Sequence, residues 1–105
     1  ILGGLNRYPR SVMLWTGLGT TLAAHDGNVL SPPAQFAFDQ AIRVAPLHPA
    51  PHFFLGLAHI RANDYRAARG QWAKALTLSP EGASYRRDIA LRLQLLDRLL
   101  AEQGG

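Results

Sequence analysis

The sequence predicts an all-α fold of stacked helical hairpins, and three observations predict it. Four residues of one stretch return at a constant offset along the chain, where Ala34, Phe38, Ala41 and Pro46 are matched by Ala68, Trp72, Ala75 and Pro80. Three residues further upstream return at an offset that is longer by three positions, where Trp15, Leu18 and Gly19 are matched by His52, Leu55 and Gly56. The composition, with 48% hydrophobic and 17% charged residues, suits a packed core in a chain of 105 residues.

The offset of the first group equals the period of the tetratricopeptide repeat, a pair of antiparallel helices. The longer offset of the upstream group places three extra residues in the turn between the helices of the first pair. We expect the glycine of each pair to allow a close approach of the two helices, with an alanine facing it and an aromatic ring beside it. A proline then ends the second helix, because it disfavours helical geometry in the residue before it.

We therefore divide residues 1–105, a single tetratricopeptide-repeat superhelix, into four parts. Residues 1–10 are the tail of a truncated repeat, and the chain, which lacks an initiator methionine, is expected to be an excised fragment. Residues 11–48 form a repeat with an extended turn, 49–82 a standard repeat, and 83–103 a capping helix. Helices are expected over 13–24, from Pro32 to 45, and over 50–62, 66–78 and 83–103, with Ser11 and Ser31 as N-caps.

The extended turn has its own signals. His25-Asp26-Gly27-Asn28 ends the first helix, and Gly27 and Asn28 tolerate left-handed backbone geometry. Val29 and Leu30 are apolar, so we expect both to fold back onto the hairpin.

The last helix carries two apolar stripes at helical spacing. Ile89, Leu93, Leu96 and Leu100 form the stripe that we assign to packing on the preceding hairpin. Leu91, Leu95 and Leu99 form a second stripe, which either widens the buried face or meets a partner, since a terminal cap is expected to be polar on its outer side.

Repeats of this kind use the first helix of each pair to line a concave groove. Counting positions along each repeat gives a predicted peptide-binding wall of ten residues: Met13, Thr16, Thr20, Phe53, Leu57, Ile60, Arg61, Arg87, Leu91 and Leu95. The same count adds Ala23, Ala24, Ala50, Ser84 and Gln94. Such an apolar wall with two arginines favours an amphipathic helix as the ligand.

Other classes of function find little support in the sequence. The net charge is +4, but ten arginines and one lysine are scattered rather than gathered in a stripe, so we expect no nucleic-acid binding. Of the four histidines (His25, His48, His52 and His59), His48 and His52 are four residues apart, but two prolines lie between them and no carboxylate is nearby in sequence. His52 and His59 stand at packing positions of the repeat. No cysteine, phosphate loop or nucleophile motif is present, so we expect neither catalysis, cofactor nor metal.

One stretch resembles a particular family. A Gly27-x-Val29-x-Ser31-Pro32 turn, followed by Leu55-Gly-Leu-Ala and by Trp72, is similar to the C-terminal domain of bacterial cytochrome c-type biogenesis proteins of the CcmI (CycH) and NrfG type. The likeness covers roughly residues 11–100.

That resemblance implies a periplasmic domain of an inner-membrane-anchored protein, attached to the membrane only through a missing N-terminal part. It implies that the domain captures the C-terminal helix of apocytochrome c and presents the polypeptide to the haem-ligation machinery as a chaperone. The alternative is a repeat scaffold for protein assembly or self-association, which would use the second leucine stripe and the open N-terminal end.

Overall fold

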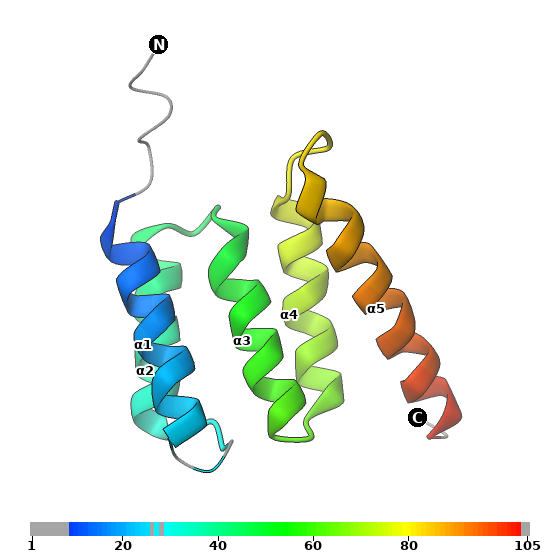
Figure 1. Cartoon of the computed structure of the whole chain (residues 1–105), viewed down its shortest axis with the longest axis horizontal. Coiled ribbons are helices and arrows are strands. Elements are labelled where there is room, and N and C mark those ends of the chain that lie inside the picture. Colours follow the sequence, from blue (N-terminus) through cyan, green and yellow to red (C-terminus); the bar gives the residue numbers. More distant parts are fainter. Residues whose placement is uncertain (1–8, 26, 28, 104–105) are drawn as a thin grey trace.

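The computed structural model describes residues 9–25, 27 and 29–103, and this part of the chain is all-α as predicted. It contains five helices, α1 (Ser11–His25), α2 (Pro32–Val44), α3 (Pro49–Arg61), α4 (Tyr65–Leu78) and α5 (Ser84–Glu102). Helices α1 and α2 form one antiparallel hairpin, α3 and α4 form a second, and α5 packs on α4 (Figure 1). Residues 1–8, predicted to be the tail of an earlier helix, lie outside the described part.

The helices begin where local chemistry satisfies their first amide groups. Ser31 adopts an extended conformation and its hydroxyl accepts a hydrogen bond from the Ala34 amide at 3.4 Å, as expected of an N-cap before Pro32. The Asp64 carboxylate accepts from the amide of Ala67 at 3.3 Å and caps α4. The prediction that Ser11 is a cap was wrong, because α1 already includes Ser11 as its first residue. The first helix begins two residues earlier than predicted, and the other predicted helix bounds differ from the structure by at most one residue.

In each hairpin, a glycine of the first helix faces an aromatic ring of the second helix. A Cβ atom added to Gly19 would lie 2.8 Å from Cδ2 of Phe38, and one added to Gly56 would lie under 3.0 Å from Cδ1 and Nε1 of Trp72. The rings therefore lie directly against the glycines rather than beside them. This contact sets the separation of α1 from α2 and of α3 from α4.

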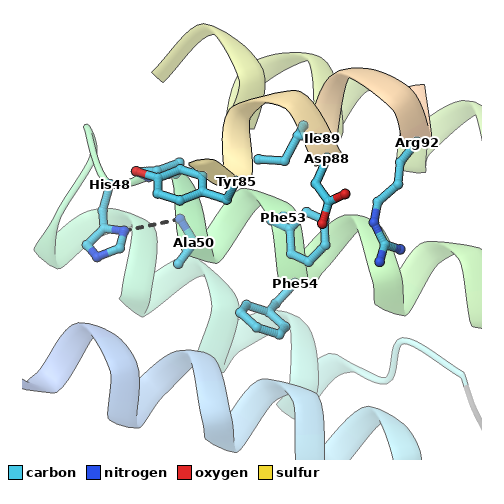
Figure 2. A pocket seen from close by; sticks show the side chains of 9 residues that line it. His48, Ala50, Phe53, Phe54, Tyr85, Asp88, Ile89 and Arg92 are labelled. Atoms are coloured by element: carbon cyan, nitrogen blue, oxygen red, sulfur yellow. Dashed lines mark hydrogen bonds between the residues drawn. The ribbon is translucent and has the colours of Figure 1, made fainter. Parts of the chain in front are cut away.

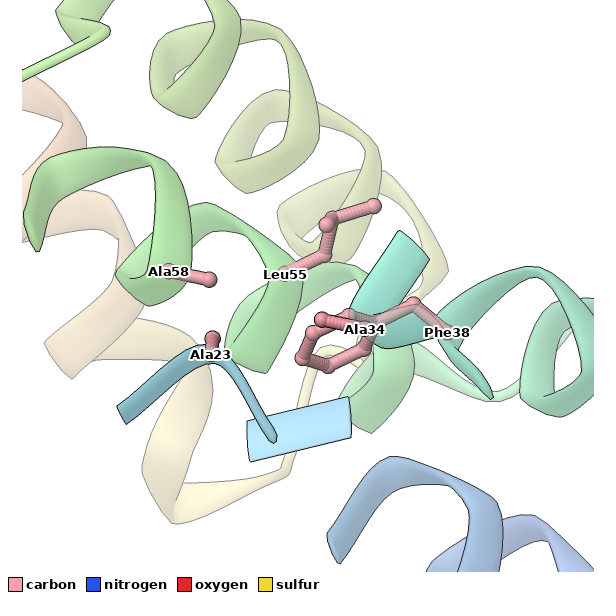
Figure 3. Close-up of a cluster of buried hydrophobic side chains, with 5 residues drawn as sticks. All are labelled: Ala23, Ala34, Phe38, Leu55 and Ala58. Carbon is pink, nitrogen blue, oxygen red and sulfur yellow. The ribbon is translucent and has the colours of Figure 1, made fainter. Parts of the chain in front are cut away.

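The first hairpin joins the second through a cluster of buried residues. Figure 3 shows Ala23 of α1, Ala34 and Phe38 of α2, and Leu55 and Ala58 of α3 gathered where these helices meet. Four of the five are small or aliphatic, so the Phe38 ring, which is fully buried, supplies much of the filled volume.

Helix α5 is attached to α4 by the apolar stripe assigned to packing. Ile89 and Leu96 are buried, and Leu93 and Leu100 pack with Leu96 against Trp72 and Ala68. The junction is also tied by Arg86, whose Nη1 donates to the carbonyl oxygens of Leu76 and Ser79, each at 3.1 Å. Arg86 thus satisfies carbonyl groups at the C-terminal end of α4.

The extended turn between α1 and α2 differs in part from expectation. Gly27 has the left-handed backbone that its position predicts, with φ of 75°, while Asn28 lies outside the described residues. Leu30 packs against the cluster of Figure 3, but the prediction for Val29 was wrong, because its side chain is 57% exposed. The half-buried Leu30 side chain is therefore the contact of this turn with the hairpin.

Candidate functional site

The structure distributes the ten predicted wall residues over three environments. The side chains of five are exposed, namely Met13, Arg61, Arg87, Leu91 and Leu95. Four others are half-buried, namely Thr20, Phe53, Leu57 and Ile60. Leu57 and Ile60 pack on the cluster around Trp72, so they support the wall more than they offer a free surface.

Thr16, the tenth, is a correction. Its side chain is 2% exposed, and its hydroxyl donates to the carbonyl oxygen of Val12 at 2.7 Å. Ala23, one of the further positions given by the count, is also buried, in the cluster that contains Ala58. Thr16 lies between Val12 and Gly19 at helical spacing, and both of these residues contact α2, so this side of α1 faces its own hairpin and not the groove.

The described residues form a pocket between α3 and α5, with a volume of about 390 Å³. Figure 2 shows side chains from both helices converging on it. Its lining residues are His48, Pro49, Ala50, Phe53 and Phe54 from the start of α3, and Tyr85, Asp88, Ile89 and Arg92 from α5. Of the ten predicted wall residues, only Phe53 lines it.

Phe53 is the centre of the pocket's aromatic wall. Its ring stacks on the Trp72 ring at 5.9 Å with an interplanar angle of 17°, and meets the Phe54 ring edge-on at 5.4 Å. The Trp72 indole donates through Nε1 to the Phe53 carbonyl oxygen at 3.1 Å. Since both ring and backbone of Phe53 are held, the pocket presents a preformed apolar surface to a ligand.

The second leucine stripe continues this surface along α5. Leu91, Leu95 and Leu99 are 51%, 62% and 37% exposed, so the stripe does not widen the buried face of the helix. Leu95 lies three residues after Arg92, and Leu99 lies seven residues after Arg92. At this helical spacing both leucines are on the Arg92 side of α5. An apolar ligand that enters the pocket could therefore extend over these leucines.

His48 closes the pocket at the start of α3. Its Nδ1 atom accepts a hydrogen bond from the Ala50 amide at 3.1 Å and so caps the helix (Figure 2). Burial lowers the pKa of His48 below its ordinary value. The direction agrees with the hydrogen bond, because Nδ1 can accept only while it carries no proton.

This arrangement predicts a loss of stability in mild acid. When the pKa of a histidine is lower in the folded state, the unfolded state binds more protons than the folded state does. The free energy of unfolding therefore rises with pH. The contribution of His48 to the stability of the fold is complete above the pKa of an unfolded histidine, about 6.5. It is lost as the pH falls from there toward the lower pKa of the folded state. Urea unfolding followed by circular dichroism at several pH values should show this loss.

The matched variant is His48→Asn, which keeps a capping acceptor that does not titrate. It should show a smaller loss of stability in acid than the wild type. Part of the dependence should persist, because burial also lowers the pKa of His59, with Asp64 acting in the opposite direction. An unchanged pH profile in His48→Asn would contradict the assignment of His48.

The remaining histidines do not join the pocket. His52 is 6% exposed and its Nδ1 lies 2.8 Å from Oε1 of Gln71, which fits the packing position predicted for it. Among the described residues, no three His, Asp or Glu side chains are grouped closely enough to hold a metal ion. The pocket offers an apolar surface with charged groups beside it, which suits the recognition of an apolar side chain.

Counting along the repeats missed Phe54, Tyr85, Asp88 and Arg92. One signal was present, since Arg92 stands one repeat period after Ala58, where the repeat has a small residue. In the part of the chain that the structure describes, no helix has both the length and the hydropathy of a membrane span. No family model, curated protein or solved structure matches this chain.

Proposed function

We propose that this chain is a non-catalytic peptide-binding module of the tetratricopeptide-repeat type, whose α3–α5 pocket anchors an amphipathic segment of a client protein. The observation that carries the proposal is the preformed aromatic pocket, open beside the exposed leucines of α5. The constant internal period of the sequence and the glycine-to-ring contact in each hairpin support the repeat type.

The resemblance of the extended turn supports a more specific client. On that basis the bound segment is the C-terminal helix of an apocytochrome c, and the module works as a periplasmic chaperone in the maturation of c-type cytochromes. One apolar side chain buried in the pocket contributes about 1.5–3 kcal/mol. That alone corresponds to a dissociation constant above about 1 mM, so the leucine stripe must add to it.

The test is a calorimetric titration with a synthetic peptide of a cytochrome c C-terminal helix. We expect Leu95→Glu to weaken binding at least about tenfold, because it places a charge on the surface that the peptide covers. Leu47→Glu is the matched control, since Leu47 is 67% exposed, similar to Leu95 at 62%, and lies in the turn before α3. The proposal fails if the peptide does not bind, or if Leu95→Glu and Leu47→Glu bind it equally well.

A second candidate function is self-association or assembly with other repeat proteins. The exposed leucines of α5 favour it, because three leucines in one stripe form an apolar surface that a second helix could cover. Sedimentation equilibrium of the wild type would then show a mass that rises with concentration, and Leu99→Glu would abolish the rise. A monomer at all concentrations would exclude this candidate.

A further inference from the structure

The α3–α5 pocket carries two opposite charges that do not pair with each other. Asp88 and Arg92 are one turn apart on α5, a spacing at which such side chains ordinarily attract. Within the described residues, neither makes an ion pair. The guanidinium carbon of Arg92 instead lies 5.4 Å from the centroid of the Phe53 ring. Figure 2 shows the side chains of Asp88 and Arg92 extending from α5 toward α3. The charge of Arg92 is thus available to a ligand.

Arg92 also stands where the preceding repeat has a small residue. The equivalent position there is Ala58, which is buried in a cluster with Ala23 of α1. Arg92 is exposed instead and lies over the Phe53 ring, so it forms one edge of the pocket and supplies its cation.

We propose, building on the peptide-binding function above, that this pocket selects a segment in which a large apolar side chain is flanked by a carboxylate. The apolar side chain takes the face of Phe53, and Arg92 moves from the ring to the carboxylate. An ion pair with a guanidinium replaces a cation–π contact of comparable strength, while the apolar group gains burial.

The local charge favours an acidic flank over a basic one. Arg87 precedes Asp88 in the sequence, and Arg61 lies about two turns along α3 from Phe53. Of these charged groups, Arg92 and Asp88 line the pocket, and Arg92 is the one that lies over the Phe53 ring. Asp88 therefore weakens the selection without reversing it.

The test uses three probes with the same phenylpropane carbon skeleton, namely phenylpropionate, phenylpropanol and phenylpropylamine. They are titrated into the whole chain and followed by NMR signals of Tyr85 and Arg92. We expect dissociation constants on the order of 1 mM or weaker. Phenylpropionate should bind tightest and phenylpropylamine weakest, with a spread of about three- to tenfold. Equal binding of the three probes, or tightest binding of the amine, would overturn the proposal.

Variants at exposed positions of α5 identify the residue responsible. Arg92→Gln should remove the preference for the carboxylate, Arg92→Glu should reverse it, and Asp88→Asn should strengthen it. Arg87→Gln removes one positive charge from the same helix and serves as the control that keeps the ranking. The same ranking in Arg92→Gln as in the wild type would contradict the role of Arg92.

Competition with the cytochrome c peptide separates this inference from the proposed function. If the peptide binds and phenylpropionate displaces it, the pocket is the anchor site of the peptide. If the peptide binds but the three probes bind equally well, this inference is wrong and the proposed function stands. If the probes rank as expected but no peptide binds, the selectivity of the pocket is supported and the proposed function is wrong.

Discussion

Replacing Gly56 by alanine is expected to lower the free energy of unfolding by about 1–3 kcal/mol. The added Cβ would lie under 3.0 Å from Cδ1 and Nε1 of Trp72, a separation that real Cβ atoms do not show. The indole cannot withdraw freely, because it stacks on Phe53 and donates to the Phe53 carbonyl oxygen. Overpacking therefore outweighs the gain of up to about 1 kcal/mol that alanine brings to a helix.

Gly70→Ala is the matched control for this prediction. Gly70 lies on the exposed side of α4, and no heavy atom of a neighbour lies within 4 Å of an added Cβ. The same substitution should there raise the free energy of unfolding by about 0.5–1 kcal/mol, because only the helix propensity changes. Urea unfolding of both variants measures the difference, and a Gly56→Ala protein as stable as Gly70→Ala would refute the close contact of Gly56 with Trp72.

The hairpins and the residues at their contacts could be predicted from the sequence because they depend on spacing along the chain, although the rings and not the alanines face the glycines. In each hairpin the glycine and the aromatic residue stand on two helices joined by one turn, as Gly19 and Phe38 do, and Gly56 and Trp72. The regular geometry of a helix fixes the direction of every side chain. The cap at Ser31 followed for the same reason, since it depends on the next three residues only. Helical spacing and capping thus predicted the all-α fold and most helix bounds.

The site was harder to predict because it depends on how closely first helices of successive repeats approach. The repeat count treated all these helices alike and assigned Thr16 to the groove. Small side chains at Ala23 and Ala58 lie where α1 and α3 meet, and Thr16 is buried within the first hairpin. At the position of Ala58, α5 carries the exposed Arg92. A count of positions contains no side-chain volumes, so it could not separate the two cases.

The exposed stripe on α5 was left open by the sequence for a different reason. Helical spacing shows that Leu91, Leu95 and Leu99 share a face, but it does not say what lies opposite that face. Among the described residues, the apolar contacts of α5 with α4 come from its other stripe, and α5 is inclined to α4 (Figure 1). Whether a helix buries one stripe or two depends on its neighbours, which are set by the whole fold.

Replacing Phe38 by alanine is expected to cost the most, about 3–5 kcal/mol of the free energy of unfolding. The ring is fully buried where α1, α2 and α3 meet, and Gly19 offers no side chain that could fill the space (Figure 3). Ala23, Ala34 and Ala58 around it are too small to collapse into the cavity. Domains of this size have a total stability of about 5–15 kcal/mol, so the variant should lose much of its cooperative thermal unfolding transition.

Phe36→Ala tests whether position, and not the loss of a ring as such, determines this cost. Phe36 lies on the same helix two residues earlier, but its side chain is 56% exposed and touches Trp15 edge-on with ring centroids 5.9 Å apart. Losing that contact and partial burial should cost no more than about 1.5 kcal/mol. Thermal unfolding followed by circular dichroism compares the two, and equal losses would mean that the buried face of α2 is not the one that carries Phe38. A larger loss in Phe38→Ala would instead tie the stability of the chain to the junction of α1, α2 and α3, which also holds α3 and its Phe53 in place.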